Sequence, residues 1–208
     1  MDKIDVLYYI NLDYRVDRKL EFLDWIEDSG FPEEKVNRIQ ATALPGRGHV
    51  GAYLSHIKTL QAFIDSPHNT CMVFEDDYQP LKIDTFWSDV GRLFECGKDF
   101  DIVMCSYNEL KSELSDIPFL HKVNYSFTAS GFIITKKFAP VLKEFWENGV
   151  KLLLQEEEMT KAQCEKYKLD VYWMELMPVS KWYTFYPRLG IQRPSFSDLQ
   201  RQYTAYNA

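Results

Sequence analysis

A short apolar run that ends in three carboxylates constrains the fold more than any other feature of this sequence. Cys71 to Phe74 has the length and composition of a β-strand buried on both faces. Glu75, Asp76 and Asp77 follow it directly. In open α/β sheets, ligands bind beyond the carboxyl ends of the strands. We therefore expect a divalent cation at these carboxylates, where it would bridge the protein to a phosphate.

Strand and helix patterns alternate along the first two-thirds of the chain. Strands are expected over residues 5–11, 36–39, 71–74, 101–106 and 127–135, and helices over 14–29, 52–64, 85–96 and 137–149. This alternation predicts an α/β fold, a three-layer α/β/α sandwich with a mostly parallel central sheet. We expect one domain over residues 1–208, with residues 182–208 as an irregular C-terminal tail that wraps the site.

Charge and composition argue against several classes of protein. The net charge of −7 disfavours a nucleic-acid-binding surface. No stretch approaches the roughly 20 apolar residues that a transmembrane segment needs, and Met1 to Asp5 lacks the pattern of a signal peptide. The four cysteines lack metal-binding spacing, which is typical of reduced core residues. We expect a cytoplasmic protein, peripheral to a membrane only if its acceptor lies there.

Glu75, Asp76 and Asp77 form an acid cluster, and Glu75 and Asp77 are its metal-binding candidates. Residues two apart on an extended backbone point the same way, and Mn²⁺ or Mg²⁺ prefers carboxylate oxygens together with substrate phosphates. Asp76 would point the opposite way or reach a ribose. The alternative is an acidic turn that caps the residues after it. The sequence contains neither GxGxxG after its first strand nor GxxxxGK[ST], so phosphate must be held in another way.

Polar residues also follow the first expected strand. Asn11, Arg15 and Arg18 suit a nucleotide, because guanidinium groups match the oxygens of a diphosphate. The alternative is that Asp13 caps a helix whose first turn carries surface charges.

A glycine-rich loop is expected over residues 44–51, before a helix. Its glycines would let a ligand approach the backbone, and the N-terminus of the helix favours an anion. Ser55 and His56 lie one turn inside that helix. The alternative for His56 is a buried histidine whose hydrogen bonds are satisfied in the core.

Six segments, in this order, resemble glycosyltransferase family 25, which includes bacterial lipooligosaccharide and animal collagen galactosyltransferases. They are Ile10–Arg18, Gly51–His56, Val73–Asp77, Ser130–Ile134, Leu169–Tyr172 and Gln192–Asp198. The resemblance spans about residues 4–199. Ala52 stands where the family usually has Cys, and Phe132 where it usually has Tyr, which removes a hydroxyl from that strand.

The resemblance implies a GT-A-like fold and inverting transfer of a hexose, galactose or glucose, from a UDP-sugar. The acceptor would be a glycan, as in lipopolysaccharide biosynthesis, or a hydroxylysine-type hydroxyl. Glu75 and Asp77 would hold Mn²⁺ or Mg²⁺. The implied contacts to the nucleotide-sugar are Asn11, Leu12, Arg15, Arg18, Gly51, Ser55, His56, Glu75 and Asp76.

An inverting transfer also needs a base that takes the proton of the acceptor hydroxyl. We assign it to Asp170, which precedes an aromatic pair, Tyr172 and Trp173, that could flank an acceptor sugar. The alternative for Asp170 is a helix cap. Asp198 is the second candidate for the base, or a late metal ligand, since no histidine follows His121.

Two other functions stay open at this point. The chain could be a catalytically inactive glycosyltransferase-like binding module, although a binding module has no need of adjacent carboxylates that repel one another. It could also be a metal-dependent phosphohydrolase. Such an enzyme would rather carry an aspartate nucleophile at the first strand tip, where this sequence has Asn11.

Overall fold

The computed structural model describes residues 3–155, 165–197 and 202–204. The described helices are α1 (Val16–Asp28), α2 (Gly48–Asp65), α3 (Ile83–Glu95), α4 (Ala139–Leu153) and α6 (Leu169–Tyr172), with the 3₁₀ turns η1 (Glu33–Lys35) and η3 (Trp173–Leu176). The described strands are β1 (Val6–Asn11), β2 (Val36–Gln40), β3 (Thr70–Glu75), β4 (Tyr78–Pro80), β5 (Ile102–Met104), β6 (Asn108–Leu114), β7 (Leu120–Phe127), β8 (Gly131–Thr135), β9 (Trp182–Phe185), β10 (Gly190–Gln192), β11 (Ser195–Ser197) and β12 (Gln202–Thr204).

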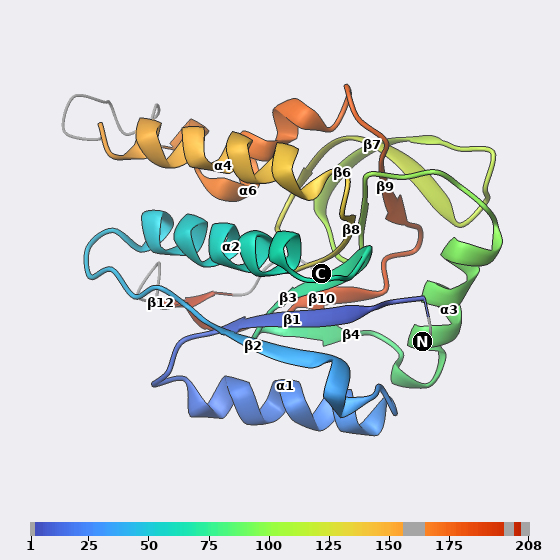
Figure 1. The fold of residues 1–208 in the computed structure, drawn as a ribbon, viewed down its shortest axis with the longest axis horizontal. Helices are drawn as coiled ribbons and strands as arrows, with labels where there is room; N and C mark the ends of the chain where they lie inside the picture. Colours follow the sequence, from blue (N-terminus) through green and yellow to red (C-terminus); the bar gives the residue numbers. More distant parts are fainter. Residues whose placement is uncertain (1–2, 156–164, 198–201, 205–208) are drawn as a thin grey trace.

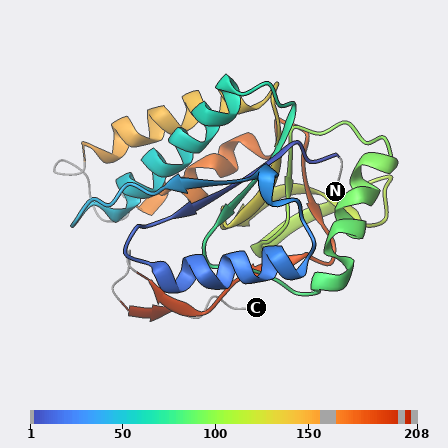
Figure 2. The same ribbon diagram turned by 60° about the horizontal axis from the view of Figure 1, so that its bottom comes forward.

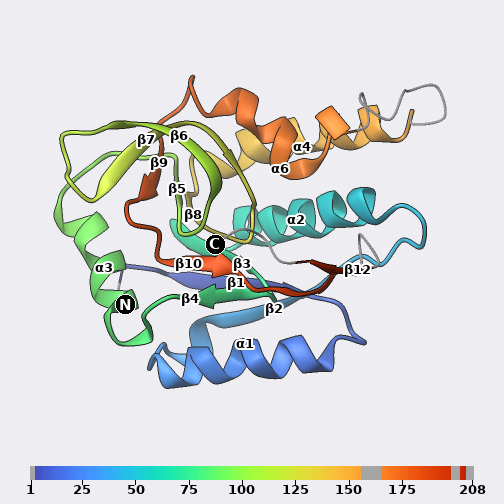
Figure 3. The same cartoon turned by 180° about the vertical axis from the view of Figure 1, so that it is seen from behind.

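Two layers of helices enclose an eight-stranded sheet (Figures 1 and 3). Helices α2, α4 and α6 pack on one face, and α1 and α3 pack on the other. The side chains of β1 alternate between these layers: Val6, Tyr8 and Ile10 join the first core cluster, whereas Leu7 and Tyr9 join the second. A strand covered on both faces must be apolar at every position, which explains the unbroken apolar runs of β1 and β3.

The strand order in the sheet is β2-β1-β3-β8-β5-β9-β7-β6. Strand β1 is parallel to β2 and β3, and β5 is parallel to β9. Strand β8 runs antiparallel to both β3 and β5, and β7 runs antiparallel to β9 and β6. Within the described sheet, all strands except β7 and β8 therefore run in one direction, and the predicted three-layer, mostly parallel α/β fold is confirmed.

The structure places the start of α2 earlier than expected. Gly48 to Gly51 form the first turn of α2, so the glycine-rich loop ends before them. Gly51 explains the difference, because a Cβ atom there would lie 2.4 Å from the Thr42 carbonyl oxygen. A residue without a side chain lets the first turn of α2 pack directly on the preceding loop.

The C-terminal segment differs from the irregular tail expected over residues 182–208. Strand β9 lies inside the main sheet, between β5 and β7, with Trp182 and Phe185 buried. Strand β10 pairs with β4, and β11 pairs with β12. Figure 2 shows β11 and β12 beside the start of α1, where Arg15 and Arg18 donate hydrogen bonds to the Phe196 carbonyl. Strands this short take their stability from distant partners, which local sequence patterns do not reveal.

The hairpin of β6 and β7 was also not expected from the sequence. It forms the far edge of the sheet and contains a register irregularity around Lys111. No described helix is long and apolar enough to cross a membrane.

Candidate functional site

A large cleft opens at the edge of the sheet where β1 and β3 end. The parallel register pairs Ile10 with Glu75, and the Asp76 amide donates to the Ile10 carbonyl at 3.1 Å. The polar residues that follow the two strands are thereby brought together. The cleft has a volume of about 1170 Å³ and is lined by the tip of β1, residues 41–47, the first two turns of α2, the acid cluster, residues 127–129, α6, Gln192 and Phe196.

Arg18 forms ion pairs with two members of the acid cluster, Asp76 and Asp77. Its Nη1 donates to Asp76 Oδ1 at 3.0 Å and to Asp77 Oδ2 at 3.1 Å. Asp76 Oδ2 accepts a further hydrogen bond from Asn11 Nδ2 at 2.7 Å. Both oxygens of Asp76 therefore have a partner within the protein, and the guanidinium partly neutralises two buried carboxylates.

Asp77 differs from Asp76 in that one of its carboxylate oxygens is bare, meaning that it has no hydrogen-bond partner among the described residues. Its Oδ2 accepts from Arg18 and from Gln192 Nε2 at 3.2 Å, whereas its Oδ1 is buried without a hydrogen-bond partner among the described residues. Burial, and then the nearby charge of Glu75, raise the pKa of Asp77 to about 7, against the opposing effect of Arg18. A buried carboxylate oxygen without a partner is costly, and either a proton or a bound cation would offset that cost.

Glu75 points toward α2 and pairs with His56. The distance between His56 Nε2 and Glu75 Oε1 is 3.1 Å, and the imidazole packs edge-on against Trp146. Because a carboxylate accepts, we assign the imidazole proton to Nε2. His56 is 1% exposed. Its Nδ1 is buried without a hydrogen-bond partner among the described residues, so His56 matches the satisfied core histidine of the alternative interpretation only in its burial. It also lines the cleft and orients Glu75.

The described residues could supply only some of the ligands that a divalent cation needs. Across residues 3–155, 165–197 and 202–204, no group of three or more His, Cys, Asp or Glu side chains is placed to hold a metal. With Asp76 engaged by Arg18 and Asn11, the candidates within this group are Asp77 and Glu75. Mg²⁺ and Mn²⁺ often take one or two carboxylates and complete their shell with phosphates and water, so this donor set is compatible with either ion.

Asn11 lies beneath the cleft and not in its lining. Its Nδ2 donates to Asp76 and, at 3.0 Å, to the Arg15 carbonyl, while its Oδ1 accepts from Arg38 Nε at 3.0 Å. Its amide is thus occupied by the protein, and its geometry supports a positioning role more than a direct nucleotide contact. Leu12, the next residue, does line the cleft.

The two predicted diphosphate arginines converge on the C-terminal segment. Arg15 donates to the Phe196 carbonyl at 3.1 Å and Arg18 donates to the same oxygen at 2.9 Å. Arg15 also forms an ion pair with Asp17 at 2.9 Å. Arg18 and Phe196 both line the cleft, and Phe196 is about half exposed.

Gly51 and Ser55 shape the opposite wall of the cleft. Ser55 Oγ donates to the Gly51 carbonyl at 2.7 Å and accepts from the Thr42 amide at 2.8 Å. Both residues line the cleft, and together they fix residues 41–47 against α2. The Ser55 hydroxyl and the Gly51 backbone therefore hold this wall of the cleft in place.

Replacing Gly51 with alanine is expected to destabilise the protein by about 1–3 kcal/mol, because the new methyl group would collide with the Thr42 carbonyl. Gly91→Ala in α3 is the matched control. No atom lies within 4 Å of that Cβ position, so alanine should stabilise by roughly 0.5–1 kcal/mol. Urea unfolding measures both values. A Gly51→Ala protein as stable as wild type would show that the wall is not tightly packed.

Asp170, the predicted base, lies in the first turn of α6 and lines the cleft. Lys168 occupies the N-cap position, so Asp170 does not cap the helix. Burial, and then the charge of Glu75, raise the pKa of Asp170, whereas a hydrogen bond from the Thr128 backbone amide lowers it. A carboxylate with a raised pKa, close to the acid cluster, suits general base catalysis. Asp198, the other candidate, lies outside the described residues.

The structure adds Thr128 and Gln192 to the site. Thr128 lines the cleft with φ +77°, a backbone conformation that costs a β-branched residue about 1–3 kcal/mol. No sequence signal indicates that conformation. Gln192 begins one of the six segments that resemble family 25, and this resemblance was the only sequence signal that pointed to it.

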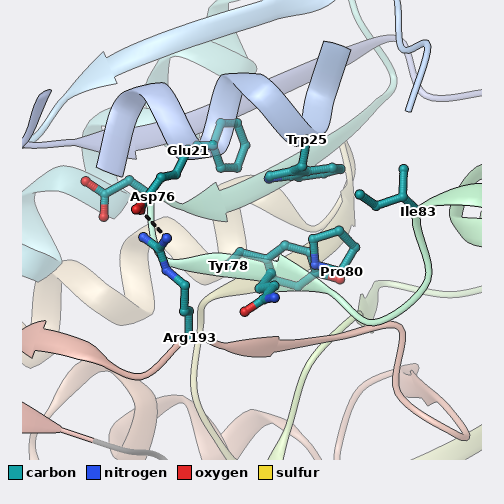
Figure 4. Close-up of a pocket in the computed structure, with 9 residues that line it drawn as sticks. Glu21, Trp25, Asp76, Tyr78, Pro80, Ile83 and Arg193 are labelled. Atoms are coloured by element: carbon teal, nitrogen blue, oxygen red, sulfur yellow. Dashed lines mark ion pairs between the residues drawn. The ribbon is translucent and has the colours of Figure 1, made fainter. Parts of the chain in front are cut away.

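A second, smaller pocket lies between α1 and β4 (Figure 4). Its volume is about 180 Å³, and an ion pair between Glu21 and Arg193 lies beside the rings of Trp25 and Tyr78. Ligand pockets for drug-sized molecules measure about 300–1000 Å³, so this pocket is too small for a nucleotide-sugar. The cleft beside the acid cluster is therefore the better candidate.

Comparisons with known proteins support the fold. No protein-family model and no curated protein matches the sequence. Among solved structures, A197 from STIV is similar over 99% of this chain and 95% of that chain, with a TM-score of 0.52 and 16% identity.

The mannose-1-phosphate geranyltransferase from Thermus thermophilus is similar over 92% of this chain and 74% of that chain, with a TM-score of 0.51 and 7% identity. A glycosyltransferase involved in the glycosylation of the major capsid of PBCV-1 aligns over 94% of this chain and 96% of that chain, with a TM-score of 0.49 and 9% identity. The two likenesses with TM-scores above 0.5, together with the three-layer α/β architecture, show a GT-A-like fold. Membership of family 25 stays a prediction.

Proposed function

We propose that this protein is a metal-dependent inverting glycosyltransferase that transfers a hexose from a UDP-sugar to a hydroxyl group. One observation carries the proposal: Asp77 holds a bare, buried oxygen at the carboxyl edge of the sheet, in a cleft of about 1170 Å³. The volume suits a nucleotide-sugar, and the bare oxygen suits a cation that a diphosphate would share.

On the donor side, Asp77 and Glu75 would hold Mn²⁺ or Mg²⁺. When bound, such an ion offsets the negative charge that develops on a leaving diphosphate. Arg18 lies within hydrogen-bond distance of Asp77 and lines the cleft, so its guanidinium can contribute to the same charge balance. Asn11 and Ser55 keep the acid cluster and the cleft wall in place through the hydrogen bonds described above.

On the acceptor side, Asp170 would take the proton of the attacking hydroxyl. Burial and the charge of Glu75 raise the pKa of Asp170, and a carboxylate with a raised pKa is a stronger base. The acceptor is a glycan or a hydroxylysine-type hydroxyl, and the hexose is galactose or glucose, as the resemblance to family 25 implies. We propose a cytoplasmic reaction, because the scattered cysteines suit a reducing compartment.

The direct test is release of UDP from UDP-galactose and UDP-glucose, with Mn²⁺, with Mg²⁺ and with EDTA. We expect slow hydrolysis of one donor that a divalent cation supports and EDTA removes. Activity that persists in EDTA would contradict the metal-dependent mechanism, and no turnover of any UDP-sugar would contradict the donor assignment.

Replacing Asp170 with asparagine is expected to lower kcat by roughly 10²–10⁴-fold, the usual contribution of a general base. Binding of Mn²⁺ should be unchanged, because Asp170 is not part of the acid cluster. Asp24→Asn, on the exposed surface of α1, is the control and should keep wild-type kcat. An Asp170→Asn enzyme with wild-type kcat would move the role of the base to another residue.

An inactive binding module is the second candidate function. Arg18 already pairs with Asp76 and Asp77, so these carboxylates are partly neutralised without a metal. A thermal shift with UDP but no turnover would support this function. A phosphohydrolase gains no support, because Asn11 at the first strand tip is buried and occupied by hydrogen bonds.

A further inference from the structure

Two polar side chains, Thr128 and Gln192, connect the walls of the cleft. Thr128 Oγ1 lies 3.3 Å from Gln192 Oε1, and Gln192 Nε2 donates to Asp77 Oδ2 at 3.2 Å. Thr128 and Asp170 both line the cleft, and the backbone of Thr128 lowers the pKa of Asp170. Thr128 and Gln192 thus lie between the predicted metal carboxylate and the predicted base, although neither was assigned a role above.

The direction of these hydrogen bonds leaves one arrangement. A carboxylate only accepts, so Gln192 must present its amide N–H to Asp77 and its carbonyl oxygen to Thr128. The Thr128 hydroxyl must then donate to Gln192. Its oxygen can still accept the hydrogen bond from the Ser130 amide at 3.3 Å. If the hydroxyl were absent, the Gln192 amide could rotate and place an oxygen against Asp77.

The strained backbone of Thr128 makes this arrangement possible. Thr128 lies in the short connection between β7 and β8, at φ +77°. In that conformation its hydroxyl lies within hydrogen-bond distance of Gln192. Thr128 and Gln192 also line the cleft, so this series of hydrogen bonds runs along the wall that a bound nucleotide-sugar would contact. Strain of this kind persists where surrounding contacts hold it and is frequent at functional sites.

We propose that Thr128 and Gln192 are positioning residues that fix Asp77 and direct its bare Oδ1 toward a divalent cation. Gln192 acts on Asp77 directly, and Thr128 acts through Gln192. The inference rests on the proposed function, because it assumes that Asp77 binds the metal.

Binding of Mn²⁺ alone, followed by electron paramagnetic resonance without any sugar, tests the proposal independently of turnover. We expect Gln192→Ala to weaken Mn²⁺ binding by about 10–100-fold, the usual effect of removing a residue that orients a metal ligand. Thr128→Val, which keeps the shape but loses the hydroxyl, should weaken it in the same direction. Thr128→Ser, which keeps the hydroxyl, should restore binding to near the wild-type value.

Kinetics separate positioning from a general loss of structure. With a UDP-hexose donor, Gln192→Ala should raise the KM for Mn²⁺ and regain most of its kcat when Mn²⁺ is saturating. Gln79→Ala, at an exposed position of β4, is the matched control and should change neither value. Thermal unfolding of each variant in EDTA verifies that it is folded.

The outcomes distinguish this inference from the proposed function. If Asp77→Ala abolishes Mn²⁺ binding and turnover while Gln192→Ala and Thr128→Val bind Mn²⁺ as wild type does, the positioning role is overturned and the proposed function stands. If Asp77→Ala binds Mn²⁺ and turns over as wild type does, the metal assignment itself fails. Equal losses in Thr128→Ser and Thr128→Val would also overturn the role of the hydroxyl.

Discussion

Asp77→Asn is expected to give a protein that is more stable than wild type at pH 8 in EDTA and inactive with metal. The pKa of Asp77 is raised to about 7 in the folded protein, from 3.8 in the unfolded chain, chiefly by burial and by Glu75. The folded state therefore keeps a proton that the unfolded state loses as the pH rises from about 4 to 7, and wild-type stability falls through that range. Asparagine has the same shape and no charge, so the variant does not lose stability through ionisation of a buried carboxyl group.

The size of the effect follows from the same linkage. A tenfold change in proton affinity is worth about 1.4 kcal/mol, so the gain at pH 8 should be on the order of a few kcal/mol. At pH 4 the two proteins should have nearly equal stability. Loss of a metal ligand should also lower activity by at least about 100-fold.

Thermal unfolding from pH 4 to pH 8 in EDTA, together with release of UDP in Mn²⁺, measures both halves of this prediction. Asp24→Asn is the control and should change neither stability nor activity. An Asp77→Asn protein that is less stable than wild type at pH 8 would show that the pairing with Arg18 outweighs burial and repulsion.

Arg18→Met should have the largest effect on stability. Arg18 is 9% exposed and bridges Asp76, Asp77 and the Phe196 carbonyl, so its loss leaves two buried carboxylates without their cation. Breaking a buried ion pair from one side costs about 3–5 kcal/mol. That is a large fraction of the total stability of a typical domain, about 5–15 kcal/mol.

Chemical denaturation measures this loss, and a second substitution tests its cause. Combining Arg18→Met with Asp76→Asn should recover part of the stability, because one unpaired charge is then removed. Arg92→Met is the control: that arginine is half exposed, pairs with Asp89 and stacks on the ring of Phe119, so its loss should cost at most about 1–2 kcal/mol. An unchanged unfolding midpoint in Arg18→Met would contradict the assignment of Arg18 as the clamp of the acid cluster.

Much of the fold followed from patterns that are local in the sequence. The apolar run before Glu75 predicted a buried strand, and β3 covers it. Polar residues were expected directly after β1 and β3, and the parallel pairing of Ile10 with Glu75 brings them to one edge of the sheet. These predictions succeeded because strand period and parallel pairing leave few arrangements for such residues.

Other features had no local signal. Strand β9 is four residues long and owes its place to β5 and β7. The choice of Arg18, 58 residues away from Asp76, as the cation for the acid cluster depends on how α1 packs against the sheet. The positive φ of Thr128 likewise follows from the contacts around it.

By itself, the sequence determined which residues carry charge at the sheet edge and which strands and helices bring them there, because side-chain periodicity is a property of the chain. Only the tertiary structure decided how each carboxylate is used. Asp76 is held by Arg18 and Asn11, Glu75 by His56, and Asp77 alone among the three keeps a bare, buried oxygen. Partners and burial arise from segments far apart in the chain, and these set the energy of a charged group in the folded protein.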